Sequence, residues 1–346
     1  MINDNVERVF VEDEPAAFDE RTERRNFSRL GFGFAVFSIV TLVVALSLQI
    51  VVGYLSPALL RNVTFLNLIS PVSMYLFALP LLLLVLSGMK AEPPEKRRIG
   101  FWKWALFLLV GFGFMYIGNY IGQGVMFGIS WAVGYDYSNM LNSLVEGQSL
   151  WLTFIFMVII APVGEELVFR KLLIDRTQKY GGFVSVLLSG LIFGLMHGNF
   201  YQFFYAFALG LLLGYVYYST GKIHLTIAIH AVINFVGSVV AKTLTDAINS
   251  MNVDIESGVA TEEEMINFLL NHGLTVAFML AFIFFVLVAM ACAVILPIVL
   301  RKRLALGKGE IEIPRGKTGR VVFLNVGIIV MIAVYIFEFV LNLIPA

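Results

Sequence analysis

The sequence predicts an all-α protein, a polytopic transmembrane helical bundle of about eight or nine transmembrane helices. Of its 346 residues, 59% are hydrophobic and only 14% are charged. An ordinary soluble domain is about 45–50% apolar and about 25% charged. In addition, several apolar stretches reach the roughly 20 residues that a helix needs to cross about 30 Å of hydrocarbon. Both observations argue against a soluble globular protein.

Nine spans are expected along the chain, at about 30–55, 67–88, 101–134, 150–179, 181–198, 202–219, 223–241, 273–300 and 321–344. The 101–134 stretch is too long for one crossing and is expected to include an interfacial piece. The polar end of 150–179 is expected to project into water. Thr261 and Glu264 have the spacing of a capping box, which predicts a short surface helix at about 262–270.

The distribution of positive charge predicts the orientation. Of the 24 Lys and Arg residues, all but Arg61 and Lys242 fall in alternate connecting segments. Under the positive-inside rule these segments face the cytoplasm, so a multi-pass protein of the cell membrane is expected, with its N-terminus inside and its C-terminus outside. Residues 1–29 are polar, mixed in charge and unlike a signal peptide. They are interpreted as a cytoplasmic tail before a transmembrane domain at 30–344.

Small residues recur at four-residue spacing, a pattern that lets membrane helices approach closely. They are Gly118/Gly122, Gly124/Gly128, Gly190/Gly194/Gly198 and Gly210/Gly214. The last two sets predict that helices 181–198 and 202–219 pack tightly. Separately, Glu338 near the end of the final span is expected to snorkel or to find a partner.

Ionisable side chains at membrane depth are concentrated in the middle third of the chain. Each costs about 2.5–3.5 kcal/mol to insert, so each indicates a function. Pro162 predicts a kink in helix 150–179. Glu166 and Arg170, four residues apart, are expected to form an ion pair, whereas Glu165 points about 100° away and is free for general acid or base chemistry. The alternative is that both glutamates are solvated at a helix end.

Two further helices carry polar pairs on one face. His197 follows Phe193 by one turn, and Asn234 follows His230 by one turn. Taken alone, each pair is more simply explained by packing or by a hydrogen bond between helices.

The depths of these residues can be compared. Glu165 and His197 both lie about 24 Å along their helices from the turn at Gly181, so an antiparallel hairpin brings them level. His230 lies only about 13 Å past its own turn and becomes level only if that turn is deeper in the membrane.

The three motifs together resemble a known family. Glu-Glu-x-x-x-Arg at Glu165–Arg170, Phe-x-x-x-His at Phe193–His197 and His-x-x-x-Asn at His230–Asn234 occur in this order on successive helices. This pattern resembles the CPBP family of intramembrane proteases, also called the CAAX amino-terminal protease or abortive-infection family. The resemblance covers about residues 150–240, where it implies a catalytic core. It implies an intramembrane endopeptidase that hydrolyses a membrane-associated peptide or protein.

The resemblance also implies roles for the motif residues. Glu165 and His197 would activate the attacking water, and His230 and Asn234 would stabilise the oxyanion. Three further residues, Glu166, Arg170 and Phe193, would support the site.

The cofactor question stays open at this point. Glu165, His197 and His230 could supply three ligands to one zinc ion, with water as the fourth. The family has been described both as metalloproteases and as glutamate-type proteases without a metal, and the His-Glu-x-x-His motif is absent from the sequence.

The expected partners are membrane lipid and a membrane-associated peptide or protein substrate, with no nucleic acid. Two other classes remain open. One is a non-catalytic immunity or scaffold protein that keeps the polar pocket for binding. The other is a proton-coupled transporter that uses Glu165 and the histidines as a relay, although transporters usually show inverted repeats and none is visible here.

Overall fold

The computed structural model describes residues 18–137, 149–250, 262–304 and 306–344, and every regular element in these ranges is helical. Within these described ranges, seven helices are long and apolar enough to cross a membrane: Glu20–Leu55 (α1), Val63–Leu86 (α2, η2 and α3), Phe101–Val133 (α4), Leu150–Tyr180 (α6 to η5), Phe200–Thr220 (α10), Ile223–Ala247 (α11, η6 and part of α12) and Leu270–Val299 (within α13). The all-α class and the multi-pass architecture are therefore confirmed.

The expected count of eight or nine spans was slightly high. Two of the predicted spans correspond to the shorter apolar helices α9 (Gly182–Met196) and α14 (Val326–Leu341). They have 15 and 16 residues. At 1.5 Å per residue such a helix is only about 23 Å long, less than the hydrocarbon thickness.

The first helix starts ahead of the apolar residues that predicted it. Asp19 caps α1 by accepting hydrogen bonds from the backbone N–H groups of Arg21 and Thr22. Polar residues in the first turns also have partners, since Tyr180 donates a hydrogen bond to Glu23. Residues 20–29 of the expected tail are therefore helical, and residues 1–17 lie outside the described ranges.

Two predicted segments belong to longer continuous helices. The 101–134 stretch forms one unbroken helix, α4, and whether part of it lies at the membrane interface stays a prediction. The expected surface helix at 262–270 is the first part of α13 (Glu262–Val299), which continues into the apolar span Leu270–Val299. Thr261 of the predicted capping box lies outside the described residues.

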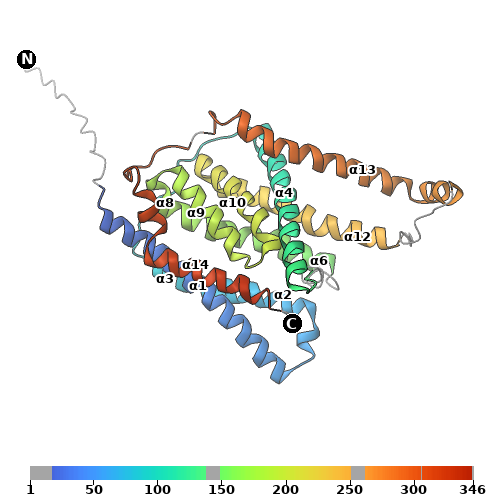
Figure 1. The fold of residues 1–346 in the computed structure, drawn as a ribbon, viewed down its shortest axis with the longest axis horizontal. Helices are drawn as coiled ribbons and strands as arrows, with labels where there is room; N and C mark the ends of the chain where they lie inside the picture. Colours follow the sequence, from blue (N-terminus) through green and yellow to red (C-terminus); the bar gives the residue numbers. More distant parts are fainter. Residues whose placement is uncertain (1–17, 138–148, 251–261, 305, 345–346) are drawn as a thin grey trace, which may run out of the picture.

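Helix α10 lies between α9 and α4 and packs closely against both of them (Figure 1). A Cβ on Gly210 would lie 2.8 Å from Gly190 Cα, and a Cβ on Gly118 would lie 2.4 Å from the backbone of Tyr205. The predicted tight packing of α9 against α10 is confirmed. Gly124 and Gly128 meet nothing within 4 Å, so that pair does not act as a packing face.

Helices α1 and α14 run side by side and cross almost backbone to backbone (Figure 1). A Cβ on Gly327 would lie 1.8 Å from the Ser28 carbonyl oxygen, and one on Gly31 would lie 2.3 Å from the Gly327 backbone. This crossing fixes α14 beside the helices that carry the polar motifs.

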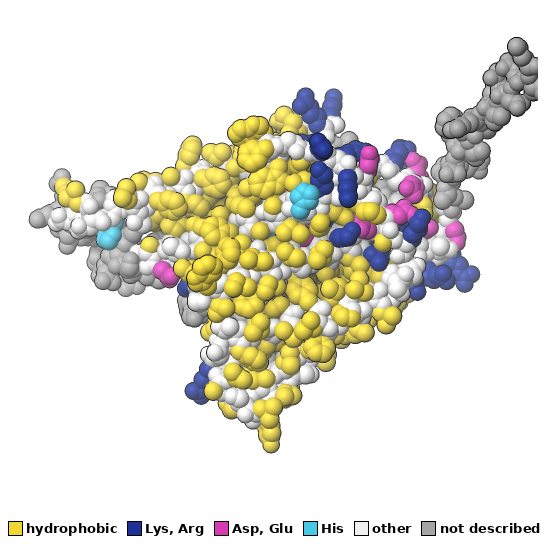
Figure 2. All heavy atoms as spheres, turned by 180° about the vertical axis from the view of Figure 1, so that it is seen from behind, with side chains coloured by type: hydrophobic (Ala, Val, Ile, Leu, Met, Phe, Trp, Pro, Cys, Tyr) yellow, Lys and Arg dark blue, Asp and Glu magenta, His cyan; other side chains and the backbone are white. Residues whose placement is uncertain are grey.

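Charged side chains gather at one end of the molecule, and most of the remaining visible surface is hydrophobic (Figure 2). Backbone hydrogen bonds join the connecting segments at this end. Arg97 N–H donates to the Thr220 carbonyl at 2.9 Å, and Ile311 N–H donates to the Lys179 carbonyl at 2.9 Å. Segments expected on the same side of the membrane therefore lie together. Which side faces the cytoplasm stays a prediction.

Candidate active site

The helix that carries both central glutamates is irregular on each side of them. The π-helical segments η3 (Phe154–Ile160) and η4 (Leu167–Leu172) flank α7 (Ala161–Glu166). Pro162 stands in the first turn of α7 and lacks the N–H that would complete a regular hydrogen-bond ladder. Such π-helical turns are frequent at functional sites. The π-helical segment η3 therefore ends directly before α7 and Pro162, and the kink itself stays a prediction.

Glu166 and Arg170 form a fully buried ion pair. Arg170 Nε lies 3.2 Å from Glu166 Oε2, and both side chains are 0% exposed, which confirms the predicted pair. The guanidinium also lies 4.3 Å from the centre of the Phe193 ring, within the range of a cation–π interaction. No guanidinium nitrogen of Arg170 forms a hydrogen bond within the described part of the chain. The stability of this buried cation therefore depends on Glu166 and Phe193.

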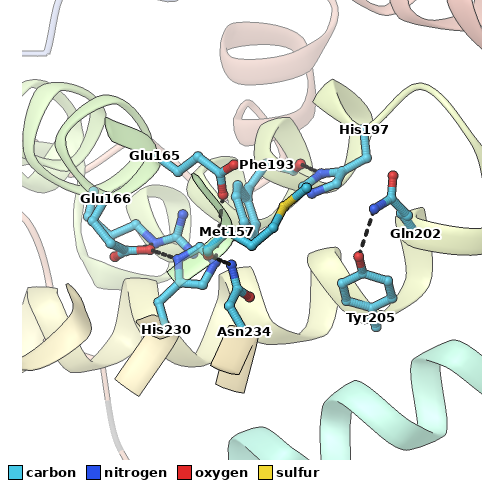
Figure 3. Close-up of polar contacts among 10 residues, drawn as sticks. Met157, Glu165, Glu166, Phe193, His197, Gln202, Tyr205, His230 and Asn234 are labelled. Atoms are coloured by element: carbon cyan, nitrogen blue, oxygen red, sulfur yellow. Dashed lines mark hydrogen bonds and ion pairs between the residues drawn. The ribbon is translucent and has the colours of Figure 1, made fainter. Parts of the chain in front are cut away.

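His230 lies between the two glutamates (Figure 3). It belongs to α11 (Ile223–Asn234), and its side chain is 3% exposed. Its Nδ1 lies 2.9 Å from Glu166 Oε1, and its Nε2 lies 3.6 Å from Glu165 Oε2. Glu166 thus contacts both Arg170 and His230, whereas the sequence pattern had suggested only the Arg170 contact.

His197 ends α9 and presents one ring nitrogen to the site. Its Nδ1 lies 2.8 Å from the Phe193 carbonyl oxygen. Because a carbonyl oxygen can only accept, Nδ1 must carry the proton, and the neutral ring keeps a lone pair on Nε2. Gly198 follows in the left-handed region, with φ of +65°, and turns the chain towards α10.

His197 and His230 both contact the same phenylalanine. The Phe193 ring lies 5.0 Å from the His197 ring and 5.7 Å from the His230 ring, nearly perpendicular to each. In the residues that the structure describes, no hydrogen bond or ion pair joins His197 to Glu165 or Glu166.

Asn234 links α11 to the helix of the glutamates. Its Nδ2 donates a hydrogen bond of 2.8 Å to the carbonyl oxygen of Met157, which lies in η3 (Figure 3). This bond leaves the amide with one further N–H donor. Asn234 is thus held in position and keeps a donor for another group.

Several polar residues near the site had no motif to mark them. Asn199 donates to the His197 carbonyl at 2.7 Å, and Gln202 donates to the Tyr205 hydroxyl at 2.9 Å. The Tyr205 ring lies 6.2 Å from the His197 ring. Tyr75, from η2 (Val72–Ala78), places its hydroxyl 2.3 Å from where a Cβ on Gly164 would stand. The polar residues just after His197 were a visible signal, but nothing in the sequence connects Tyr75 with Gly164.

The geometry does not assemble a metal site. No group of three or more His, Cys, Asp or Glu side chains is placed to hold a metal ion within the described ranges. Glu165, His197 and His230 therefore do not form the three-ligand set that the sequence allowed. The contacts of His230 with the two glutamates instead fit proton transfer.

Fold and site together define a class: a multi-pass helical membrane protein with a buried acid–base cluster contributed by three of its helices. Residues 147–236 match the family model Rce1-like, described as type II CAAX prenyl endopeptidase Rce1-like. This segment contains all three motifs and confirms the resemblance to the CAAX protease (CPBP) family, which implies an intramembrane protease. No curated protein and no solved structure matches the chain.

Proposed function

We propose that this protein is an intramembrane endopeptidase that hydrolyses peptide bonds of a membrane-associated peptide or protein. The observation that carries the proposal is the buried contact of His230 with Glu165 and Glu166, inside the segment that matches the protease family. Ionisable groups at this depth are expensive to bury and are kept where they have a function.

Two groups in the site can accept a proton from water. Glu165 offers a carboxylate, and its side chain is 14% exposed, whereas Glu166 is fully buried. His197 offers the lone pair on Nε2 because its Nδ1 is committed to the Phe193 carbonyl. In the proposed mechanism these two bases take the proton of the attacking water and later deliver it to the leaving amine.

Two other groups can donate to the oxyanion that forms on the attacked carbonyl. Asn234 has a free amide N–H, and His230 can donate through Nε2 when that nitrogen carries a proton. Each such donor is worth about 2.7–4 kcal/mol in other hydrolases. Glu166 fixes the orientation of His230 through Nδ1, and Arg170 fixes Glu166.

A cleavage assay tests this proposal. The full chain is purified into lipid nanodiscs and incubated with a farnesylated CaaX peptide, the same peptide without the prenyl group, and a library of peptides from membrane proteins. We expect mass spectrometry to detect new products with the wild type that are missing with Glu165→Gln. If no peptide is cleaved above the level of that variant, the proposed function is wrong. The ratio of the two CaaX rates shows whether the prenyl group is recognised.

A further inference from the structure

A cavity of about 260 Å³ with a mixed polar and apolar lining lies next to the candidate active site, between α1, α2 (Val63–Pro71), η2 and α14. Most of its walls come from outside the segment that matches the protease family. Its polar lining consists of Ser38, Thr41, Gln49, Ser70 and Glu338. Gln49 and Ser70 are exposed and Ser38 is buried, so polar groups extend from an open mouth to an enclosed floor.

Glu338 of α14 is one of the residues that line this cavity. It is half-buried, and the Ser38 hydroxyl forms a hydrogen bond with one of its oxygens. Within the described ranges, no lysine, arginine or histidine forms an ion pair with Glu338. A carboxylate at membrane depth is costly unless a cation or several donors accompany it. The cavity therefore has an acidic side chain without a basic partner from the described chain.

The cavity adjoins the turn that carries His197. Met196 lines the cavity wall, and Glu338 Oε2 lies 3.9 Å from where a Cβ on Gly198 would stand. Asn342, one turn after Glu338, donates a hydrogen bond of 3.0 Å to the Gly198 carbonyl. Because successive Cα atoms are about 3.8 Å apart, a peptide bound at His197 needs to continue only a few residues to reach the cavity.

We propose that this cavity is a substrate subsite that accepts a lysine or arginine side chain of the peptide, with Glu338 as its counter-ion. The proposal rests on the proposed peptidase function. The volume is below the roughly 300–1,000 Å³ of pockets for whole small molecules and suits a single side chain. Phe37, Leu42 and Met74 offer apolar contacts to an aliphatic stem, and Glu338 meets the charged head group. Glu338 is thus a specificity-determining residue outside the three motifs.

Matched peptides test the subsite. Each pair differs at one position, which is either lysine or its neutral analogue acetyl-lysine, and the position is moved along a cleaved peptide. In nanodiscs of phosphatidylglycerol, which has no ammonium group, we expect the wild type to prefer lysine at one position by about tenfold or more, through KM. Glu338→Gln should abolish this preference by raising KM for the lysine peptide to about that for the acetyl-lysine peptide.

A second variant serves as the matched control. Thr41→Val changes the same cavity without removing charge, and the Thr41 hydroxyl already donates to the Phe37 carbonyl at 2.8 Å. This variant should keep the lysine preference. Glu338→Asp, which retains the carboxylate, should keep it in part.

The outcomes separate the two proposals. If cleavage depends on Glu165 but the wild type shows no preference for lysine at any position, the subsite is overturned and the peptidase function stands. This result needs no variant, so it holds even if Glu338→Gln fails to fold. If Glu338→Gln alters activity only in phosphatidylethanolamine nanodiscs, the cavity binds a lipid ammonium group and the peptide subsite is wrong. If no cleavage depends on Glu165, the peptidase function fails, and the subsite fails with it.

Discussion

Replacing Glu165 with glutamine is expected to lower kcat/KM for peptide cleavage by about 10²–10⁴-fold, the usual contribution of a positioned general acid or base. Glutamine keeps the shape of the side chain but cannot accept a proton from water. Of the two adjacent glutamates, Glu165 is partly exposed, at 14%, whereas Glu166 is 0% exposed and contacts both Arg170 and His230. Rates of product formation at several substrate concentrations give the measurement.

The control for this prediction is Glu95→Gln. Glu95 is exposed, pairs with Arg97 at 2.9 Å and lies outside the segment that carries the three motifs, so its replacement should leave the rate unchanged. Activity of the Glu165 variant within twofold of the wild type, with both proteins equally stable, would show that Glu165 is not the base.

Replacing Arg170 with methionine should destabilise the fold by about 3–5 kcal/mol, because it leaves Glu166 as a buried charge without its cation. Both side chains are 0% exposed, so water cannot compensate the lost partner. The free energy of unfolding, measured by titration with SDS in mixed micelles, gives the effect. An exposed arginine provides the comparison, since Arg97→Met should change stability by no more than about 0.5 kcal/mol.

The double variant Glu166→Gln with Arg170→Met separates loss of charge balance from loss of packing. Glutamine can still accept the hydrogen bond from His230 Nδ1. Neither position 166 nor position 170 then carries a buried charge without a partner. We expect the double variant to recover at least half of the stability lost by Arg170→Met. A double variant less stable than either single variant would mean that the ion pair is not the source of the effect.

Hydropathy predicted where the helices lie but not where each one ends. The first turns of α1 are polar, and they are helical because Asp19 caps them and Glu23 has a partner in Tyr180, neither of which a hydropathy window detects. Similarly, α9 carries an apolar sequence but is shorter than the bilayer core, since Gly198 turns the chain directly after His197. The close crossing of Gly31 and Gly327 joins residues almost 300 positions apart and has no local pattern.

The candidate site was partly visible in the sequence. Spacing within one helix predicted the ion pair of Glu166 and Arg170, because partners four residues apart share a face. The bond between Glu166 and His230 joins two helices, so no spacing rule could show it. The contribution of Tyr75 and the cavity at Glu338 depend on helices outside the matched segment, where the sequence gives only generic apolar spans.

The central claim is that Glu165 and His197 act on one water molecule in one site. The most direct test compares kcat/KM for Glu165→Gln, His197→Ala and the double variant, since residues that act as a unit have strongly non-additive effects. We predict that kcat/KM of the double variant is only slightly lower than that of the less active single variant. If the two losses multiply, so that the double variant falls by the product of the single effects, the residues act independently and the shared site is contradicted.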